Sequence, residues 1–359
     1  MSLRRRGVGK KSDAPPRRRK DTTDNNPDYR KICVERMMKN RLKLTLKITG
    51  IIIIGLLALL VYTFLPMKLD VSADQALAPA STRNGSDPAR LPVVKLSILK
   101  AGKMPAKQSF VYRGGSWFGP YENGMAAILV RHPQASFLID AGFGANVDQH
   151  WETIPWLMRQ LSSYVKETPA AAQLQQNGIA LDQIKFAVIT HSHWDHISGL
   201  EDFPGLEVRM PTAELQFIRD RKMPGLIDQM IDKLNVHTFD FTGGPYENFD
   251  RSLDLFNDGS VVLVPLPGHT TGSTGVFVNL HSNKRFLFTG DLTWALEGFE
   301  LPAERPWLAR RLADYDEAEV RRSIIKVHLL MRKYPDLIVV PAHDRRVHEH
   351  IACLPQFEN

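Results

Sequence analysis

The chain has 359 residues, of which 43% are hydrophobic and 9% aromatic, enough for one large globular domain or two modest ones. Its net charge of +7 is uneven, because residues 1–47 hold 16 Lys and Arg against 5 Asp and Glu, which leaves 30 basic and 34 acidic residues for the rest. This slightly acidic remainder argues against nucleic acid as a partner, because phosphate binding needs a basic face on the folded domain. The two cysteines, Cys33 and Cys353, lie on opposite sides of a long apolar stretch and imply no disulfide framework.

The chain begins with a basic tail and an apolar segment. The tail, residues 1–47, starts with Arg, Lys, Pro, Asp and Asn without hydrophobic periodicity, so we expect it to be largely disordered. Residues 48–67 are uncharged and mostly apolar, close to the roughly 20 residues that a membrane-spanning helix needs. We predict a single transmembrane helix there. Arg41, Lys43 and Lys47 crowd its N-terminal side, so the positive-inside rule places the tail in the cytoplasm and the rest on the outer (periplasmic or extracellular) face of the cell membrane.

A cleaved signal peptide is the alternative for this segment, because residues 76–78 offer small side chains at cleavage-like spacing. The 47 residues before the segment and the 18-residue apolar run from Ile48 to Leu65 favour a retained anchor instead. Residues 68–90 are small, polar and Pro-containing, which is typical of a flexible linker. We expect the folded domain to comprise residues 91–359.

From Leu91 onwards, short β-type runs alternate with helical stretches, which is typical of an α/β fold. The run KFAVIT is followed by HSHWDH, which holds three histidines and an aspartate within six residues. In an extended segment His191 and His193 point the same way and can share one metal ion. Asp195 and His196 come where the chain turns, so they can serve a neighbouring metal ion. The spacing alone therefore suggests two metal ions.

Three later residues extend this pattern. His269 lies in PLPGHTTGSTG, Asp291 ends RFLFTGD and His343 ends LIVVPAH, at successive intervals of 73, 22 and 52 residues after His196. Together with HSHWDH, this series resembles the signature of the metallo-β-lactamase superfamily over residues 91–350. The resemblance implies an α/β fold of the αββα sandwich type, here preceded by the single transmembrane helix.

The resemblance also implies a role for each of these side chains. One metal ion would be held by His191, His193 and His269, the other by Asp195, His196 and His343, with Asp291 as the bridge between them. Asp195 is in addition the candidate catalytic carboxylate. Asp140, in SFLIDAG, is expected to orient a ligand imidazole, or it is an ordinary turn aspartate before glycine. Imidazoles and carboxylates favour two Zn²⁺ ions and leave Fe and Mn open.

The implied activity is hydrolysis, in which a hydroxide shared by the two metal ions attacks an ester-type bond. True β-lactamases lack a bridging aspartate at the position of Asp291. The ligand order and the long helical insert before His343 resemble acyl-homoserine-lactone hydrolases, which predicts a small ester or lactone substrate with an acyl chain. Those lactonases have a tyrosine at the position of Trp294, and indole cannot act as an acid or base, so lactone specificity stays open. The alternatives are a thioesterase, a phosphodiesterase, a sulfur dioxygenase, or a membrane protein that binds metal without turnover.

Two aromatic segments are candidates for the substrate pocket. The loop GGSWFGPYENG, residues 114–124, carries Trp117, Phe118 and Tyr121, and it either covers an acyl chain or is an ordinary packed hairpin. Trp294 is a further candidate for the pocket. The segment ELPAERPWLARRL, residues 300–312, either contacts lipid headgroups or caps the helical insert.

Overall fold

The structure is a computed structural model that describes residues 27–72, 90–222 and 225–359. The first part of the predicted tail and most of the predicted linker, with the alternative cleavage site, lie outside the described residues. The chain divides into two compact units, Met1–Leu60 and Val61–Asn359.

Helix α1 (Pro27–Phe64) contains most of the predicted transmembrane segment and begins well before residue 48. Pro27 and Asp28 suit the first turn of a helix, and the residues up to Lys47 are rich in Lys, Arg, Met and Leu, which favour helix. The structure therefore places a helix in residues 27–47, where the sequence predicted a largely disordered tail. Among the described residues, α1 is the one helix that is long and apolar enough to cross a membrane, and a signal sequence would meet the same criteria.

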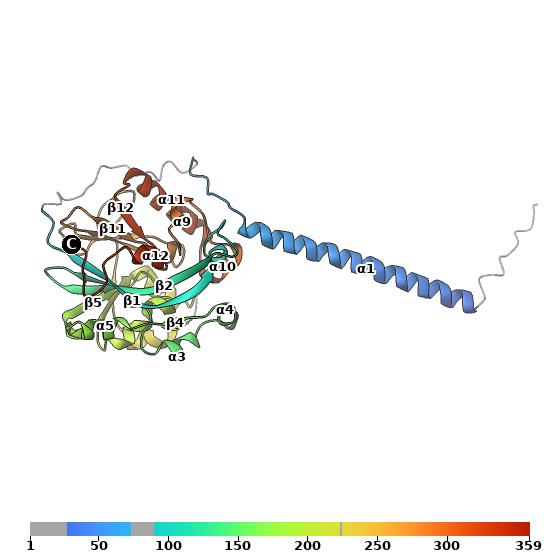
Figure 1. Ribbon diagram of the computed structural model, residues 1–359, viewed down its shortest axis with the longest axis horizontal. Coiled ribbons are helices and arrows are strands. Elements are labelled where there is room, and N and C mark those ends of the chain that lie inside the picture. Colours follow the sequence, from blue (N-terminus) through green and yellow to red (C-terminus); the bar gives the residue numbers. More distant parts are fainter. Residues whose placement is uncertain (1–26, 73–89, 223–224) are drawn as a thin grey trace, which may run out of the picture. The chain divides into compact units, whose positions relative to one another are not determined.

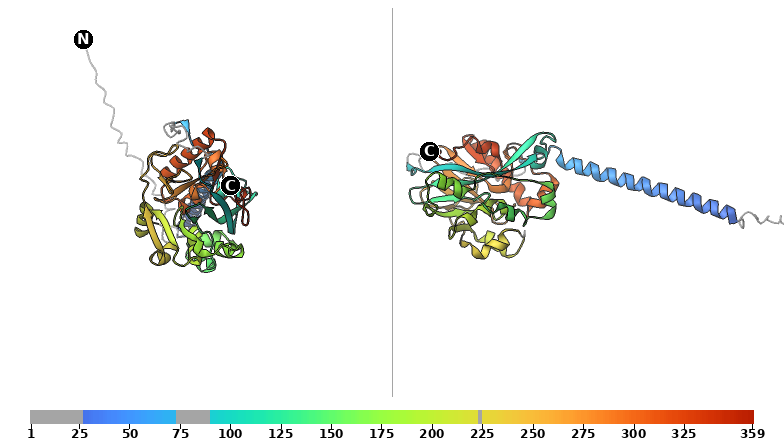
Figure 2. Two further views of the ribbon diagram at one scale, coloured as in Figure 1. Left: turned by 90° about the vertical axis from the view of Figure 1, so that its left-hand side faces the viewer. Right: turned by 60° about the horizontal axis from the view of Figure 1, so that its bottom comes forward.

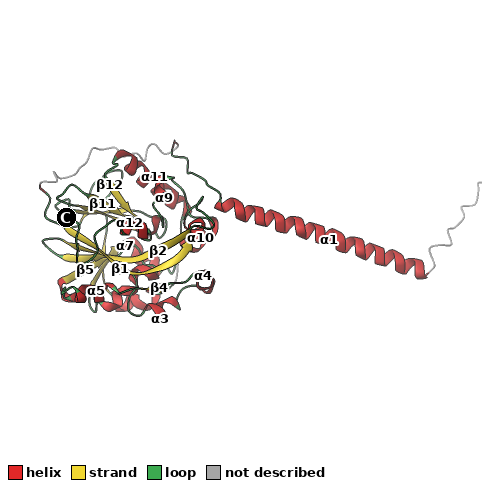
Figure 3. Ribbon diagram, viewed as in Figure 1, coloured by secondary structure: helices red, strands yellow, loops and turns green. Residues whose placement is uncertain are grey.

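The domain after α1 is built on two sheets (Figures 1 and 3). The first sheet has the order β4-β1-β2-β3-β5-β6-β7. A long antiparallel hairpin of β1 and β2 leads into β3, and β3, β5, β6 and β7 then run parallel. The strands are β1 (Lys95–Lys107), β2 (Pro120–Arg131), β3 (Ser136–Ile139), β4 (Val165–Lys166), β5 (Ile184–Val188), β6 (Glu207–Pro211) and β7 (Asn235–Phe239).

The second sheet has the order β12-β11-β10-β9-β8, antiparallel except for the parallel pair β11 and β12. Its strands are β8 (Leu253–Asp254), β9 (Val261–Pro265), β10 (Thr274–Asn279), β11 (Arg285–Phe288) and β12 (Leu337–Val340). All six residues of β10 are buried, because both faces of this strand are covered. Val276 and Val278 face the first sheet's apolar core, whereas Phe277 faces the helices on the other side.

Helices cover the outer face of each sheet, which gives four layers in the order helix, sheet, sheet, helix (Figures 1 and 2). On the second sheet, α11 packs Val320, Ile324 and Val327 against the strands with helical spacing. On the first sheet, the outer cover includes Leu174 of α5 and Ile218 of α7. The predicted αββα sandwich is therefore confirmed. The helices that flank the sheets are α2 (Gln108–Val111), α3 (Val147–Trp151), α4 (Trp156–Leu161), α5 (Ala170–Gln176), α6 (Trp194–Ile197), α7 (Thr212–Arg219), α8 (Ile227–Met230), α9 (Glu297–Glu300), α10 (Trp307–Ala313), α11 (Glu317–Lys333) and α12 (Arg345–His348).

Candidate metal centre

The residues predicted to bind metal all follow the ends of strands. The HSHWDH segment begins at His191, shortly after the end of β5 at Val188. His269 follows β9, Asp291 follows β11 and His343 follows β12. The two sheets bring these loops to one place, where the possible ligand atoms form three groups. Within each group, the atoms all lie within 4.8 Å of one another. The groups are His191, His193 and His269; His191, His196 and Asp291; and Asp195, His196 and His343. All seven predicted residues therefore lie in a single cluster.

Three imidazole nitrogens of this cluster are buried without a hydrogen-bond partner among the described residues. They are the Nε2 atoms of His191, His193 and His269. A buried polar atom without a partner costs about 1–3 kcal/mol, and three around one point would cost more. The possible ligand atoms of these three histidines all lie within 4.8 Å of one another, so the donor set fits a divalent cation.

Asp291 lies between the two outer groups. Its Oδ1 is 2.8 Å from Nε2 of His343 and 3.1 Å from Nε2 of His196, and its Oδ2 is 3.5 Å from Nε2 of His269. Oδ2 of Asp195 is 3.4 Å from Nε2 of His343. One buried carboxylate thus contacts histidines from both groups, which is the arrangement that a bridging ligand needs.

The electrostatics of the cluster separate its histidines into two kinds. Burial, and then the neighbouring imidazoles, hold the pKa of His191 and of His193 well below the usual range, so both rings are neutral and keep a free lone pair. Burial also acts to lower the pKa of His196, but Asp140 and Asp291 outweigh it and the pKa is raised. Burial acts to raise the pKa of Asp291, but His343 and His196 hold it well below the usual range. The carboxylates therefore attract positive charge to the centre.

Asp140 is placed to orient one of the histidines. Its Oδ2 is 2.7 Å from Nδ1 of His196, and its Oδ1 accepts the backbone N–H of Thr190 at 2.6 Å. The hydroxyl of Thr190 donates to the same carboxylate at 2.8 Å. The backbone of Asp140 has a φ of +55°, a left-handed conformation that is strained for a residue other than glycine and that recurs at functional sites.

Asp314 and Arg305 orient His269, and the sequence analysis did not identify either role. Oδ1 of Asp314 lies 3.0 Å from Nδ1 of His269, and the same carboxylate pairs with the guanidinium of Arg305. Arg305 also donates to the backbone carbonyl of Asp291 at 2.8 Å. Both side chains are almost fully buried. Asp314 lies 45 residues after His269, so no local pattern could have linked them.

The substitution Asp314→Asn is expected to weaken metal binding about 10- to 100-fold, because an amide holds the His269 ring less firmly than a carboxylate. Isothermal titration of the metal-depleted protein with Zn²⁺ measures the change. Asp316→Asn is the matched control, because this residue caps α11 by accepting from two backbone N–H groups and asparagine caps equally well. Equal affinities of the Asp314→Asn variant and the native chain would show that the carboxylate is not needed to orient His269.

Glu214 joins the two loops that carry the first group, another role that the sequence did not reveal. Its Oε1 accepts the backbone N–H of Ser192 at 2.8 Å, and its Oε2 accepts the hydroxyl of Thr270 at 2.6 Å and the backbone N–H of Gly272 at 3.1 Å. Glu214 is fully buried, and burial raises its pKa although these hydrogen bonds oppose the shift. A Cβ atom at residue 272 would lie 2.4 Å from the Cβ of Glu214, so this close approach requires glycine.

The candidate pocket residues take different positions. The indole N–H of Trp294 donates to Oδ2 of Asp291 at 2.9 Å, and the Arg305 guanidinium lies over its ring, 4.7 Å from the centroid. Tyr121 is buried and donates its hydroxyl to the backbone carbonyl of Trp294 at 3.0 Å. Trp117 is 47% exposed and Phe118 is 89% exposed. Trp294 and Tyr121 thus adjoin the centre, while Trp117 and Phe118 lie on the surface.

In the segment 300–312, the charged side chains are mostly internal. Glu304 is buried and pairs with Arg310 and Arg321, so it ties α10 to α11. Arg305 serves the centre as described above. Trp307, by contrast, is 44% exposed. The charged side chains Glu304, Arg305 and Arg310 thus pack within the domain, whereas one aromatic ring of the segment stays on the surface.

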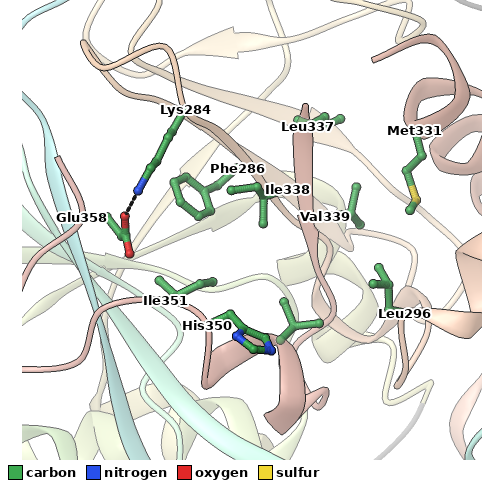
Figure 4. A pocket seen from close by; sticks show the side chains of 11 residues that line it. Lys284, Phe286, Leu296, Met331, Leu337, Ile338, Val339, His350, Ile351 and Glu358 are labelled. Atoms are coloured by element: carbon green, nitrogen blue, oxygen red, sulfur yellow. Dashed lines mark hydrogen bonds and ion pairs between the residues drawn. The ribbon is translucent and has the colours of Figure 1, made fainter. Parts of the chain in front are cut away.

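A separate apolar pocket of about 360 Å³ lies beside the edge strand β12 (Figure 4). Phe286, Ile338 and Ile351 line it, and the ion pair of Lys284 with Glu358 lies at one side. None of the seven predicted metal-binding residues lines this pocket. It is therefore distinct from the candidate centre.

Comparison with known proteins agrees with this geometry. The sequence model of the metallo-beta-lactamase superfamily matches residues 125–343. The chain is 29% identical over 240 residues to the probable metallo-hydrolase Rv2300c of Mycobacterium tuberculosis, covering 60% of this chain and 73% of that protein. It is 24% identical over 271 residues to the N-acyl homoserine lactonase AttM of Agrobacterium fabrum, covering 74% of this chain and 98% of that protein. A solved N-acyl homoserine lactone hydrolase with the product N-hexanoyl-L-homoserine at its catalytic metal centre matches with a TM-score of 0.59 at 17% identity, covering 75% of this chain and 100% of that one, and shares the fold.

Proposed function

Because the chain belongs to the metallo-beta-lactamase superfamily and is a metal-dependent hydrolase of that fold, we propose that it is a membrane-anchored, dinuclear hydrolase of lactones or related esters. The position of Asp291 carries the dinuclear part of this proposal. Its carboxylate lies within 3.5 Å of histidines from both groups, so it can hold two cations at a fixed spacing. Lactonase relatives support the substrate class.

The metal-binding roles follow from the grouping of the ligand atoms. His191, His193 and His269 would hold one ion, and Asp195, His196 and His343 the other, with Asp291 shared. Nitrogen and oxygen ligands without a thiolate favour Zn²⁺ and are compatible with Fe or Mn. Asp140 and Asp314 would fix two of the imidazoles through their Nδ1 atoms.

When bound, the ions would lower the pKa of a water molecule and polarise the substrate carbonyl. Asp195 is the most exposed carboxylate of the cluster, with 12% of its side chain accessible, against 5% for Asp291. It is therefore the carboxylate best placed to accept the proton of the attacking water and pass it to the leaving alkoxide oxygen. The indole of Trp294 holds Oδ2 of Asp291 and so fixes the orientation of the bridge.

The metal and substrate classes can be tested together. The full chain, purified in detergent, is analysed for bound metals and assayed on a panel of lactones, thioesters and phosphodiesters. We expect about two equivalents of Zn²⁺ per chain and turnover of at least one lactone or ester. Turnover of thioesters or phosphodiesters alone would show that the proposed substrate class is wrong and that the protein is a thioesterase or a phosphodiesterase. Metal binding without any turnover would favour a protein that holds metal without catalysis.

The anchor is proposed from α1, whose residues 48–60 present large apolar side chains to the surroundings. We expect the full chain to float with liposomes and to resist extraction by alkaline carbonate, with the N-terminus in the cytoplasm and the domain outside. A phosphatase reporter fused after Asn359, which folds only outside the cytoplasm, measures the topology. A soluble mature chain that begins near Pro79 would show instead that the segment is a cleaved signal peptide.

A further inference from the structure

Large apolar side chains on the surface of the domain concentrate in three segments. These are the loop from β1 to β2, helix α4 and the start of α10, which lie at one end of the domain (Figures 1 and 2). Phe118 is 89% exposed and Trp156 is 66% exposed, values that a soluble surface rarely shows for rings of this size. We call the following set the apolar rim: Phe110, Trp117, Phe118, Trp156, Leu157, Leu161 and Trp307.

A residue near each of the three segments in the sequence contacts the candidate centre or a residue beside it. Tyr121, just beyond the loop, donates its hydroxyl to the carbonyl of Trp294 at 3.0 Å. Trp151, just before α4, packs its ring 5.6 Å from that of Trp194, which lies between His193 and Asp195. Arg305, just before α10, contacts the carbonyl of Asp291. The three segments that carry the apolar rim are therefore connected to the surroundings of the centre through these neighbouring residues.

The apolar run from Ile48 to Leu65 ends beside the same rim. Its last residues belong to the compact unit Val61–Asn359, in which the ring of Phe64 lies 5.4 Å from Phe110 and 4.5 Å from Trp117. The buried guanidinium of Arg113 donates to the carbonyls of Tyr62 at 2.9 Å and Leu65 at 3.1 Å. These bonds satisfy carbonyls that the end of a helix leaves open. The end of the anchor is thus fixed to the β1–β2 loop.

We propose that the apolar rim lies in the interface of the membrane that holds the anchor, so that the centre faces the lipid surface and receives acyl-chain-bearing substrates from the bilayer. This inference depends on the anchor proposed above. Chain continuity keeps the rim close to the point where residue 65 leaves the hydrocarbon. Tryptophan favours this interfacial zone, and phenylalanine is common on the apolar face of segments that lie in it. Lys107 and Arg311, which also pairs with Glu317, are exposed cations beside the rim that suit lipid headgroups.

Tryptophan fluorescence offers a direct test, because all six tryptophans lie in the domain and none lies in α1. The full chain is placed in nanodiscs made with bromine-labelled phospholipids, which quench tryptophans at the lipid surface. We expect strong quenching. The triple variant Trp117→Phe, Trp156→Phe, Trp307→Phe keeps the rim apolar but removes its reporters, so the quenched fraction should fall at least about twofold.

A second variant changes the contact itself. Phe118→Asp with Trp156→Asp should reduce quenching of the remaining tryptophans, whereas Val93→Asp, at a residue that is 58% exposed outside the three segments, should leave it unchanged. If the chain floats with liposomes but its tryptophan fluorescence is not quenched, the proposed contact of the rim with lipid is wrong, whereas the proposed membrane anchor is supported. Equal quenching of the native chain and the triple variant would also overturn it. A chain that does not float would contradict the anchor and the inference together.

Discussion

Replacing Asp291 with alanine is expected to abolish hydrolysis of any substrate that the panel identifies, lowering kcat/KM by at least about 10³-fold. Among the described residues, Asp291 is the one carboxylate that contacts histidines of both groups, so its loss would remove the proposed bridge and leave His196 and His343 without their shared partner. His193→Ala should have a comparable effect, because it removes one of the three buried Nε2 atoms that have no hydrogen-bond partner among the described residues. Bound metal should fall in both variants, as elemental analysis of the purified chain will show.

Two further variants serve as comparisons: Asp291→Asn tests the charge of the side chain, and His328→Ala is a control histidine outside the cluster. The asparagine variant keeps the size of the side chain but loses the charge, so it should also lose metal. His328 is half-buried like His193, but its Nδ1 lies 2.7 Å from the carbonyl of Phe299, away from the cluster, so its replacement should leave kcat/KM and metal content unchanged. Near-native turnover with two bound metals in Asp291→Ala would show that Asp291 is not the bridge.

Replacing Trp294 with tyrosine is expected to raise turnover of acyl-homoserine lactones, by up to about 10²- to 10³-fold. The lactonases that this chain resembles have a tyrosine hydroxyl at this position, directed at the reacting group. Here the indole N–H is already bonded to Oδ2 of Asp291, and the ring is held against Arg305, so Trp294 offers no free donor to a substrate. Native turnover of these lactones should therefore be weak, and steady-state kinetics on lactones of increasing chain length measure both proteins.

Trp294→Phe is the matched control, because it removes the N–H without adding a hydroxyl and should give no increase. A native chain that opens these lactones with kcat/KM above roughly 10⁵ M⁻¹s⁻¹, within the ordinary enzyme range, would show that the tyrosine is dispensable. Absence of lactone turnover in both the native chain and Trp294→Tyr would point to another ester, thioester or phosphodiester.

The sequence by itself determined the family and the positions of the candidate ligands. His191, His269, Asp291 and His343 could be found because each follows a strand at a position that local residue pattern marks, and because strand ends in α/β folds carry functional loops. The αββα sandwich followed from the same series. Metal identity, the bridging role of Asp291 and the fate of the apolar segment stay predictions.

Only the tertiary structure showed what surrounds these residues. The contacts of Asp314 with His269, and of Glu214 with Ser192 and Thr270, join residues 22 to 56 positions apart, and a buried carboxylate gives no periodic signal in the sequence. The role of Trp294 also needed the tertiary structure. In the sequence it stands only where the resembling lactonases have a tyrosine, whereas in the fold its indole N–H donates to Asp291. Exposure is likewise a tertiary property: Phe118 and Tyr121 lie close together in the sequence, yet packing buries Tyr121 and leaves Phe118 at the surface. The candidate ligands can be recognised in the sequence because each lies in a short motif directly after a strand. The orientation of the ligands and the chemistry of the surface depend instead on which distant segments the packed sheets bring together.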